Sequence, residues 1–146
     1  MAFIPDADYA FIYNQVPRLC VDLAIRDKHG ALLLTRRDIP PYKGLWHLPG
    51  GGIKFKETIA EAASRIAKKE FGVEVRLGSF IGPCEIMNDD LDEANPRHSV
   101  SIVYETEVIA GEPQTSSETA EIGYFTELPD AMHPYHGPFI KEHALI

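Results

Sequence analysis

The first third of the chain alternates apolar runs with short polar segments. Residues 18–26 (RLCVDLAIR) and 31–36 (ALLLTR) are β-branched or aliphatic runs, which are typical of strands. The polar segment 27–30 between them ends in glycine, so we predict that the two strands form a hairpin. Residues 39–52 (IPPYKGLWHLPGGG) are rich in proline and glycine and predict a loop, with a short extended piece around 45–48.

Residues 57–71 carry the clearest helical periodicity in the sequence. Apolar side chains share one face of this helix, at Ile59, Ala62, Ala63 and Ile66. Polar and charged side chains share the opposite face, at Glu57, Glu61, Ser64 and Lys68. Gly72 follows directly and is a typical stop signal, so we predict that the helix ends there.

The second half predicts further strands and a late helix. Residues 73–82 and 98–108 have the pattern of strands, separated by the polar and acidic segment 87–97, and another strand is expected at 122–126. A short helix is expected after Leu128, with a last one at the C-terminus. Strands that alternate with one long and one late helix imply the α/β class, arranged as a mixed α/β sandwich.

Length, composition and charge restrict the classes of function. A chain of 146 residues, 45% of them hydrophobic, is long enough to bury a core, and we expect one domain over residues 1–146. The net charge of −8 argues against broad nucleic-acid binding, but a small phosphorylated ligand remains compatible with it. The N-terminal segment lacks the pattern of a signal peptide, and no apolar run approaches the ~20 residues of a membrane span.

The two cysteines indicate a reducing compartment. Cys20 and Cys84 lie within apolar runs and lack the spacing of metal ligands, so we expect buried free thiols and a cytoplasmic location. A structural zinc site is the weaker alternative.

One carboxylate does not fit the two faces of the predicted helix. Glu70 falls one turn after Ile66, on the side that otherwise packs inward, where an ionised carboxylate needs a compensating partner. Gly50, Gly51 and Gly52 precede this helix and leave backbone carbonyls accessible. Carbonyl and carboxylate oxygens are ligands that Mg²⁺ prefers, which makes a metal site one interpretation. The alternatives are a frayed helix end that exposes Glu70, and a plain flexible glycine turn.

Residues 51–73 contain a specific motif. They read GGIKFKETIAEAASRIAKKEFGV and resemble the Nudix box, G-x5-E-x7-R-E-U-x-E-E-x-G-U, where U is aliphatic. The matching positions are Gly51, Glu57, Arg65, Glu70, Gly72 and Val73. Ile66 and Lys69 replace two glutamates of the box, so Glu70 is the remaining carboxylate of that trio and one bound ion is expected.

The resemblance implies a fold and a chemistry. Nudix proteins are α/β/α sandwiches around a mixed β-sheet, and they hydrolyse nucleoside diphosphate-X compounds with Mg²⁺ or Mn²⁺. By resemblance, the carbonyl of Gly50 and the carboxylates of Glu70 and Glu118 would hold the ion. Glu57 and Arg65 would brace the loop against the helix, and the alternative for this pair is a solvated surface contact.

The chain is also similar to the GDP-mannose mannosyl hydrolase branch of the superfamily, over roughly residues 5–126. This likeness implies that Tyr9 stacks on the base, that Asp22 has a role at the substrate and that Arg37 holds the diphosphate. Arg36 and Arg37 are adjacent, so in a strand they point to opposite faces and one of them would be a solvated charge.

The same branch breaks the sugar C–O bond by attack of water on carbon, with a histidine as the base. The corresponding segment 115–121 contains no histidine here. Glu118 or Glu121 is therefore expected to supply a metal ligand or to activate water, and Glu118 is preferred as the ligand.

Several candidates have a purely structural alternative. Tyr9 would otherwise cover the edge of the core, and Asp22 would be a satisfied polar group on a half-exposed face. Trp46 is expected to pack the loop. Three histidines could carry protons but are more simply structural: His98, His133 and His136. Four acidic residues are most simply a solvated loop: Asp89, Asp90, Asp92 and Glu93.

The favoured function is hydrolysis of a nucleotide sugar such as GDP-mannose. One alternative is cleavage of ADP-ribose or a nucleoside triphosphate at a P–O bond, and another is a non-catalytic nucleotide-sensing Nudix module. The expected partner is a small nucleotide, with no nucleic acid and no membrane. A homodimer is expected because the resembled branch dimerises.

Overall fold

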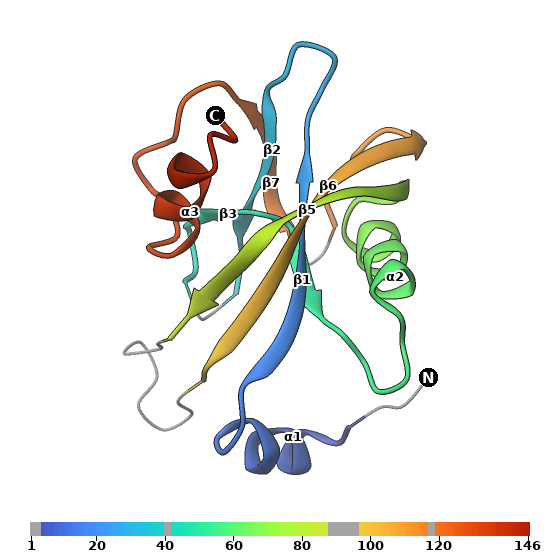
Figure 1. Ribbon diagram of the computed structural model, residues 1–146, viewed down its shortest axis with the longest axis vertical. Coiled ribbons are helices and arrows are strands. Elements are labelled where there is room, and N and C mark those ends of the chain that lie inside the picture. Colours follow the sequence, from blue (N-terminus) through green and yellow to red (C-terminus); the bar gives the residue numbers. More distant parts are fainter. Residues whose placement is uncertain (1–3, 40–41, 88–96, 117–118) are drawn as a thin grey trace.

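The computed structural model describes residues 4–39, 42–87, 97–116 and 119–146, and its strands form two sheets (Figure 1). The helices are α1 (Asp6–Tyr13), α2 (Ile59–Phe71) and α3 (His136–Glu142). The strands are β1 (Arg18–Ile25), β2 (Leu32–Arg37), β3 (Trp46–His47), β4 (Gly50–Gly52), β5 (Glu74–Ile86), β6 (Ser99–Ala110) and β7 (Thr119–Phe125). Among these described residues, no helix is long and apolar enough to cross a membrane.

The larger sheet is mixed. Its strand order is β4-β1-β6-β5, in which β1 runs parallel to β6 while the other two pairs are antiparallel. The smaller sheet has the order β3-β2-β7 with antiparallel pairs. The predicted α/β sandwich with a mixed sheet is therefore confirmed.

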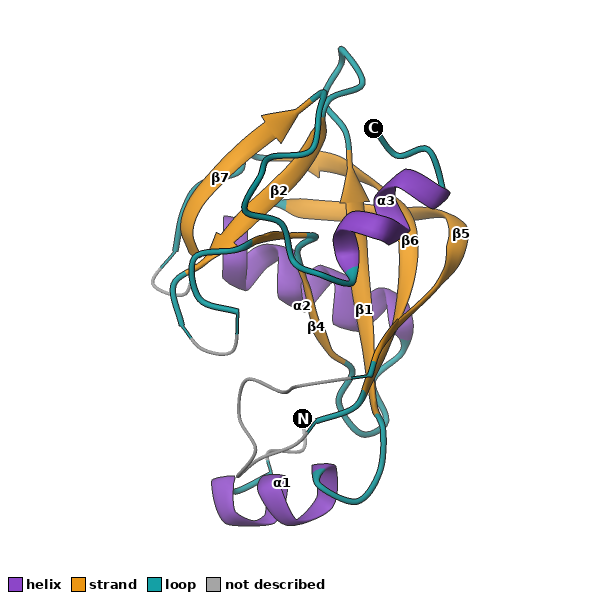
Figure 2. Cartoon of the chain, turned by 90° about the vertical axis from the view of Figure 1, so that its left-hand side faces the viewer, coloured by secondary structure: helices purple, strands orange, loops and turns teal. Residues whose placement is uncertain are grey.

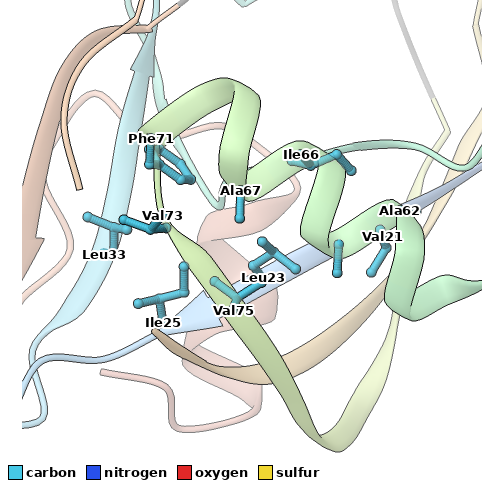
Figure 3. Packing of buried hydrophobic residues seen from close by; sticks show 11 residues of the cluster. Val21, Leu23, Ile25, Leu33, Ala62, Ile66, Ala67, Phe71, Val73 and Val75 are labelled. Carbon is cyan, nitrogen blue, oxygen red and sulfur yellow. The ribbon is translucent and has the colours of Figure 1, made fainter. Parts of the chain in front are cut away.

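Both faces of the larger sheet are covered, which explains the almost continuous apolar run of β1. Val21, Leu23 and Ile25 point to one face and pack with Ile66 and other apolar residues of α2, as Figure 3 shows. Ala24, on the opposite face, belongs to a second cluster that includes residues of β2 and α3. In Figure 1, α2 and α3 accordingly lie on opposite sides of β1.

The predicted hairpin of the first two strands is wrong. The turn is present, since Gly30 has a φ of 82° and the Asp27 carboxylate accepts hydrogen bonds from the backbone N–H groups of His29 and Ala31. Beyond it, however, β1 and β2 join different sheets, and the bridge between Arg26 and Leu32 is an isolated one. The turn thus connects two layers, because each strand finds its hydrogen-bond partners in a different sheet.

The glycine segment before the helix is also not a plain loop. Gly50–Gly52 form β4, which pairs with β1 in the register Asp22↔Gly50. Trp46–His47 form β3, within the extended piece predicted around 45–48. Glycine alone gives no strand signal, and the partner strand determines this pairing.

The helix α2 begins at Ile59, two residues later than predicted. Thr58 is its N-cap and forms a reciprocal capping box with Glu61. The helix ends, as predicted, at Gly72, which has a left-handed φ of 71°. It does not fray before Glu70.

Other boundaries shift outward, and one helix was not predicted. β5 continues to Ile86 through several bulges, β6 ends at Ala110, and β7 begins at Thr119. α3 begins at His136, eight residues after Leu128. α1 has no buried residue, which is why core periodicity did not predict it. Figure 2 shows α1 apart from the two sheets.

Candidate functional site

A cavity of about 140 Å³ lies on the face of the larger sheet that is turned away from α2. Its walls come from β1, β6, the segment from Tyr42 to Gly51, and the start of α3, and no residue of α2 lines it. Its carboxylate, guanidinium and imidazole side chains fall into three groups: Asp22, three arginines and three histidines. The register of the strands places Asp22 in the cavity, because alternate residues of β1 and β6 point to this face of the sheet.

Asp22 lines this cavity and is 5% exposed. It contacts the box loop, which we define as residues 48–58 between β3 and α2. A Cβ atom added to Gly50 would lie 1.8 Å from the Oδ1 atom of Asp22 and 2.5 Å from the carbonyl oxygen of Val21. Position 50 therefore has no room for a side chain, and only glycine fits there. The other carboxylate oxygen, Oδ2, has no hydrogen-bond partner among the described residues, so the interpretation of Asp22 as a satisfied polar group is wrong.

The histidines hold the segment that leads into β4. The Leu48 backbone N–H donates to Nδ1 of His136 at 2.9 Å, and Nδ1 of His47 donates to the Leu48 carbonyl at 2.7 Å. A carbonyl accepts and an N–H donates, so these contacts fix the proton of His136 on Nε2 and that of His47 on Nδ1. His133 accepts from the N–H groups of Tyr135 and His136 through Nδ1.

Burial favours the neutral form of two of these imidazoles, His47 and His133. Burial, followed by the neighbouring His136, lowers the pKa of His47 to about 4. Burial likewise lowers the pKa of His133 to about 2. The lone-pair nitrogen of each ring accepts a hydrogen bond, for His47 from the Thr35 hydroxyl at 3.3 Å. A role as base therefore does not fit His133 or His136, because the acceptor nitrogen of each ring is already bonded. His98 does not line the cavity.

Three arginines give the cavity its positive charge. Arg37 lines it, with its Nε donating to the carbonyl of Ile39 at 3.0 Å. The adjacent Arg36 instead forms an ion pair with Glu121, which is not among the lining residues. The predicted opposite orientation of these two arginines is thus observed. Arg18 and Arg97 are the other lining arginines.

Tyr9, on α1, contacts the same two arginines. The guanidinium carbons of Arg18 and Arg97 lie 5.9 Å and 5.7 Å from the centre of its ring, within the range of cation–π contacts. Its ring also packs against Tyr13. Tyr9 is half-buried, although no residue of α1 enters the core.

Glu57 and Arg65 form a brace between the box loop and α2. Arg65 donates from Nε and Nη2 to both carboxylate oxygens of Glu57, at 2.8 Å and 3.0 Å, and from Nη2 to the carbonyl of Gly52 at 2.8 Å. The Glu57 side chain is 1% exposed, so its predicted place on the solvated face is wrong. The hydrogen bonds from Arg65 hold the pKa of Glu57 below its usual value.

Glu70 lies within the last turn of α2 and is half-buried. The preceding turn contacts the glycine strand, since a Cβ added to Gly51 would lie 3.3 Å from Cδ1 of Ile66. The described residues contain no cluster of three histidine, cysteine or acidic side chains that could hold a metal ion. Glu118 and the acidic residues at 89, 90, 92 and 93 lie outside the described part of the chain.

Some lining residues were not singled out from the sequence. Arg18, His47 and Arg97 lie far apart along the chain and match no motif, so only the fold brings them together. The one available signal was His47, which directly precedes the Leu-Pro-Gly segment of the box loop. Trp46 packs against Phe125, as expected. Cys20 and Cys84 are buried free thiols, also as expected.

Comparison with known proteins agrees with this geometry. The family model described as NUDIX domain matches residues 16–143. The chain is 31% identical to the low-salt glycan biosynthesis protein Agl8 of Haloferax volcanii, over 90% of this chain and 85% of that protein. It is 34% identical to an ADP-ribose pyrophosphatase of Methanocaldococcus jannaschii, over 75% of this chain and 62% of that protein.

A solved structure shares the fold. The MutT NUDIX hydrolase from Burkholderia pseudomallei superposes with a TM-score of 0.74 at 26% identity, covering 86% of this chain and 97% of that one. Nudix proteins generally use divalent metal ions, consistent with the oxygen ligands expected here. Because the family model matches nearly the whole chain and the box loop is braced against its helix, this chain belongs to the NUDIX family and is a Nudix hydrolase.

Proposed function

We propose that this chain is a magnesium-dependent hydrolase of a nucleotide sugar such as GDP-mannose. The observation that carries the proposal is the joint presence of Arg18, Arg37 and Arg97 around one buried carboxylate, Asp22. Arginine forks suit a diphosphate, which carries several acceptor oxygens and more than one negative charge. This local positive charge allows the cavity to attract an anion although the whole chain has a net charge of −8.

The metal ion would bind beside the arginines, at the box loop. The Gly50 carbonyl and the carboxylates of Glu70 and Glu118 would hold it, a set of hard oxygen donors that suits Mg²⁺. The ion would neutralise negative charge on the departing nucleoside diphosphate. In this proposal Arg37 binds the diphosphate, Tyr9 stacks on the base, and Arg65 with Glu57 fixes the position of the loop.

The relatives support a sugar-linked substrate. Agl8 is a glycan biosynthesis protein by name, and it is similar to this chain over most of both sequences. The likeness to an ADP-ribose pyrophosphatase supports the alternative of P–O cleavage, although the chain spans less than two thirds of that protein. Glu118 remains our preferred metal ligand of the two glutamates, because Glu121 pairs with Arg36 and does not line the cavity.

A substrate panel with product identification tests the proposal. The purified chain would be incubated with Mg²⁺ or Mn²⁺ and GDP-mannose, UDP-glucose, ADP-ribose or dGTP. We expect the highest kcat/KM for a nucleotide sugar. Free sugar plus nucleoside diphosphate would show C–O cleavage, and sugar 1-phosphate plus nucleoside monophosphate would show P–O cleavage. In ¹⁸O-labelled water, the label would then appear in the sugar or in a phosphate, respectively.

Other results would contradict the proposal. If the chain hydrolysed dGTP or ADP-ribose but neither GDP-mannose nor UDP-glucose, the proposed substrate would be wrong. A panel with no turnover, combined with a nucleotide that raises Tm, would indicate a sensing module. The loss of two box glutamates at Ile66 and Lys69 makes this comparison necessary.

We also propose that the chain forms a homodimer through α1. This helix has no buried residue, and it leaves Phe11 71% exposed, next in the chain to a further exposed apolar residue, Ile12. Sedimentation equilibrium should give twice the mass of the chain, and Phe11→Ser should shift the equilibrium toward the monomer. A monomer at all concentrations of the unmodified chain would refute this.

A further inference from the structure

Three buried polar atoms meet in the cavity without a hydrogen-bond partner. They are Oδ2 of Asp22, Oγ of Ser101 and Nε2 of His136, and no other buried side-chain nitrogen or oxygen of the described residues lacks a partner. The three residues are 5%, 1% and 4% exposed, and all line the cavity beside the arginines. Buried polar atoms in native proteins are almost always paired, so three unpaired ones at one place indicate a binding site for a polar ligand.

The chemistry of the three atoms favours a neutral polar group over an ion. The Leu48 N–H occupies Nδ1 of His136, so Nε2 carries a hydrogen and can only donate. This N–H would repel a cation, while the carboxylate of Asp22 would repel a phosphate. The two atoms lie 3.1 Å apart, but their orientation does not give a hydrogen bond between them.

A hydroxyl group satisfies these atoms together. It can donate its hydrogen to Oδ2 of Asp22 and accept the hydrogen of Nε2 of His136. The Ser101 hydroxyl can donate or accept and so completes a site for a second hydroxyl. Register places it near Asp22, because Ser101 of β6 pairs with Cys20 of β1 and Asp22 lies two residues further along the same face.

We propose that Asp22, Ser101 and His136 form a subsite that recognises the hydroxyl groups of a sugar bound directly to a diphosphate. The proposal rests on the proposed function, since the arginines that would hold the diphosphate line the same cavity. In a nucleotide sugar, the group next to the diphosphate on either side is a sugar, either the ribose or the terminal sugar. The subsite therefore selects for polyhydroxyl ligands and against pyrophosphate alone.

Calorimetric binding to Ser101→Ala tests the subsite without requiring turnover. The probes are inorganic pyrophosphate, GDP, 2′-deoxy-GDP and GDP-mannose, each without added metal. We expect the variant to bind pyrophosphate as the unmodified chain does, and to bind GDP-mannose about fivefold more weakly, the loss typical of one neutral hydrogen bond. Its Tm should not fall, because the removed hydroxyl has no partner in the unliganded protein. Asp22→Asn should lose about tenfold or more, since a charged acceptor is removed.

The arms of the experiment distinguish the two sugars. A loss for GDP that is absent for 2′-deoxy-GDP assigns the subsite to the ribose, and a loss confined to GDP-mannose assigns it to the terminal sugar. The subsite would be overturned if both variants and the unmodified chain bound every sugar-bearing probe with equal affinity. It would also be overturned if the unmodified chain bound pyrophosphate and none of the sugar-bearing probes. In either case the three atoms would hold water and not a sugar. Sugar-dependent binding without any hydrolysis would instead overturn the proposed function and leave the subsite intact.

Discussion

At the scale of single residues, the close approach of a neighbouring side chain explains why the box loop has glycine at position 50, and backbone conformation does not. Gly50 has no left-handed φ, so its lack of a side chain does not serve an unusual backbone. The carboxylate of Asp22 occupies the space that a Cβ would need. Gly50 and Asp22 are therefore interdependent, although 27 intervening residues separate them in the sequence.

Replacing Gly50 by alanine should be strongly destabilising. The added Cβ would overlap both the Asp22 carboxylate and the backbone of Val21, and the backbone cannot move away cheaply. We expect a loss of about 2 kcal/mol or more in the free energy of unfolding, measured by urea denaturation. Gly51→Ala is the matched control, because its nearest neighbour is the flexible end of Ile66. Equal losses in the two variants would show that the Asp22 contact is not the cause.

At the scale of elements, α2 depends on polar contacts at its start and on packing along its inner face. The capping box of Thr58 and Glu61 begins the helix, and Arg65 ties it to the carbonyl of Gly52. The brace joins the glycine strand to the helix that carries Glu70. Its geometry should thus affect stability and activity together.

The brace predicts an acid-dependent stability. The pKa of Glu57 is lower in the folded protein than its unperturbed value of 4.5, because Arg65 hydrogen-bonds the ionised form. The contribution of the Glu57–Arg65 pair to the free energy of unfolding is therefore complete above pH 4.5. It is lost as the pH falls through the lower pKa of the folded protein. Glu57→Gln should cost about 2 kcal/mol at pH 7 and flatten the decline between pH 5 and pH 3.

The exposed Glu74 provides the control for this measurement. Glu74→Gln should follow the unmodified chain over the whole range of pH in urea denaturation. If Glu57→Gln and Glu74→Gln gave the same profile, the brace would have no part in acid stability.

The elements also show what sequence could and could not predict. The long helix, its stop at Gly72 and the five longer strands follow from local periodicity, which is why they were predicted. The partner of each strand does not follow from local pattern, so the hairpin prediction for 18–36 failed where β1 and β2 join separate sheets. The motif likewise marks Glu57 and Arg65, whereas Arg18, His47 and Arg97 become neighbours only in the folded chain.

At the scale of the whole molecule, the cavity is formed between layers. The larger sheet supplies Asp22 and Ser101, and α3 with the segment before it supplies His136 and His133. His47 and His136 hold Leu48 at the junction through hydrogen bonds to its carbonyl and its N–H. Protonation would remove the acceptor nitrogen by which His47 bonds the Thr35 hydroxyl and that by which His133 bonds the start of α3, and it would place a charge on two buried rings.

Stability should fall in mildly acidic solution for this reason. The pKa values of His47, about 4, and of His133, about 2, both lie below the unperturbed 6.5. The unfolded chain therefore binds more protons than the folded one below pH 6.5, and the stability decreases as the pH falls. For His47 alone the loss is about 2 kcal/mol between pH 6.5 and pH 5.

Thermal denaturation from pH 7.5 to pH 5 measures this loss. His47→Gln should reduce the slope in this window, which lies above the window of Glu57. A melting temperature that does not change between pH 7 and pH 5 would contradict neutral buried histidines.

We propose that Glu70 serves the metal-dependent hydrolysis of a nucleoside diphosphate compound. Its most direct test is kcat/KM with Mg²⁺ for Glu70→Gln, beside Lys69→Gln as a control on the exposed side of the same helix turn. We predict that Glu70→Gln lowers kcat/KM by about 100-fold or more at unchanged Tm, since a metal-bound carboxylate is lost. Lys69→Gln should stay within about threefold of the unmodified chain, as expected of a surface residue. Full activity of Glu70→Gln would contradict the account.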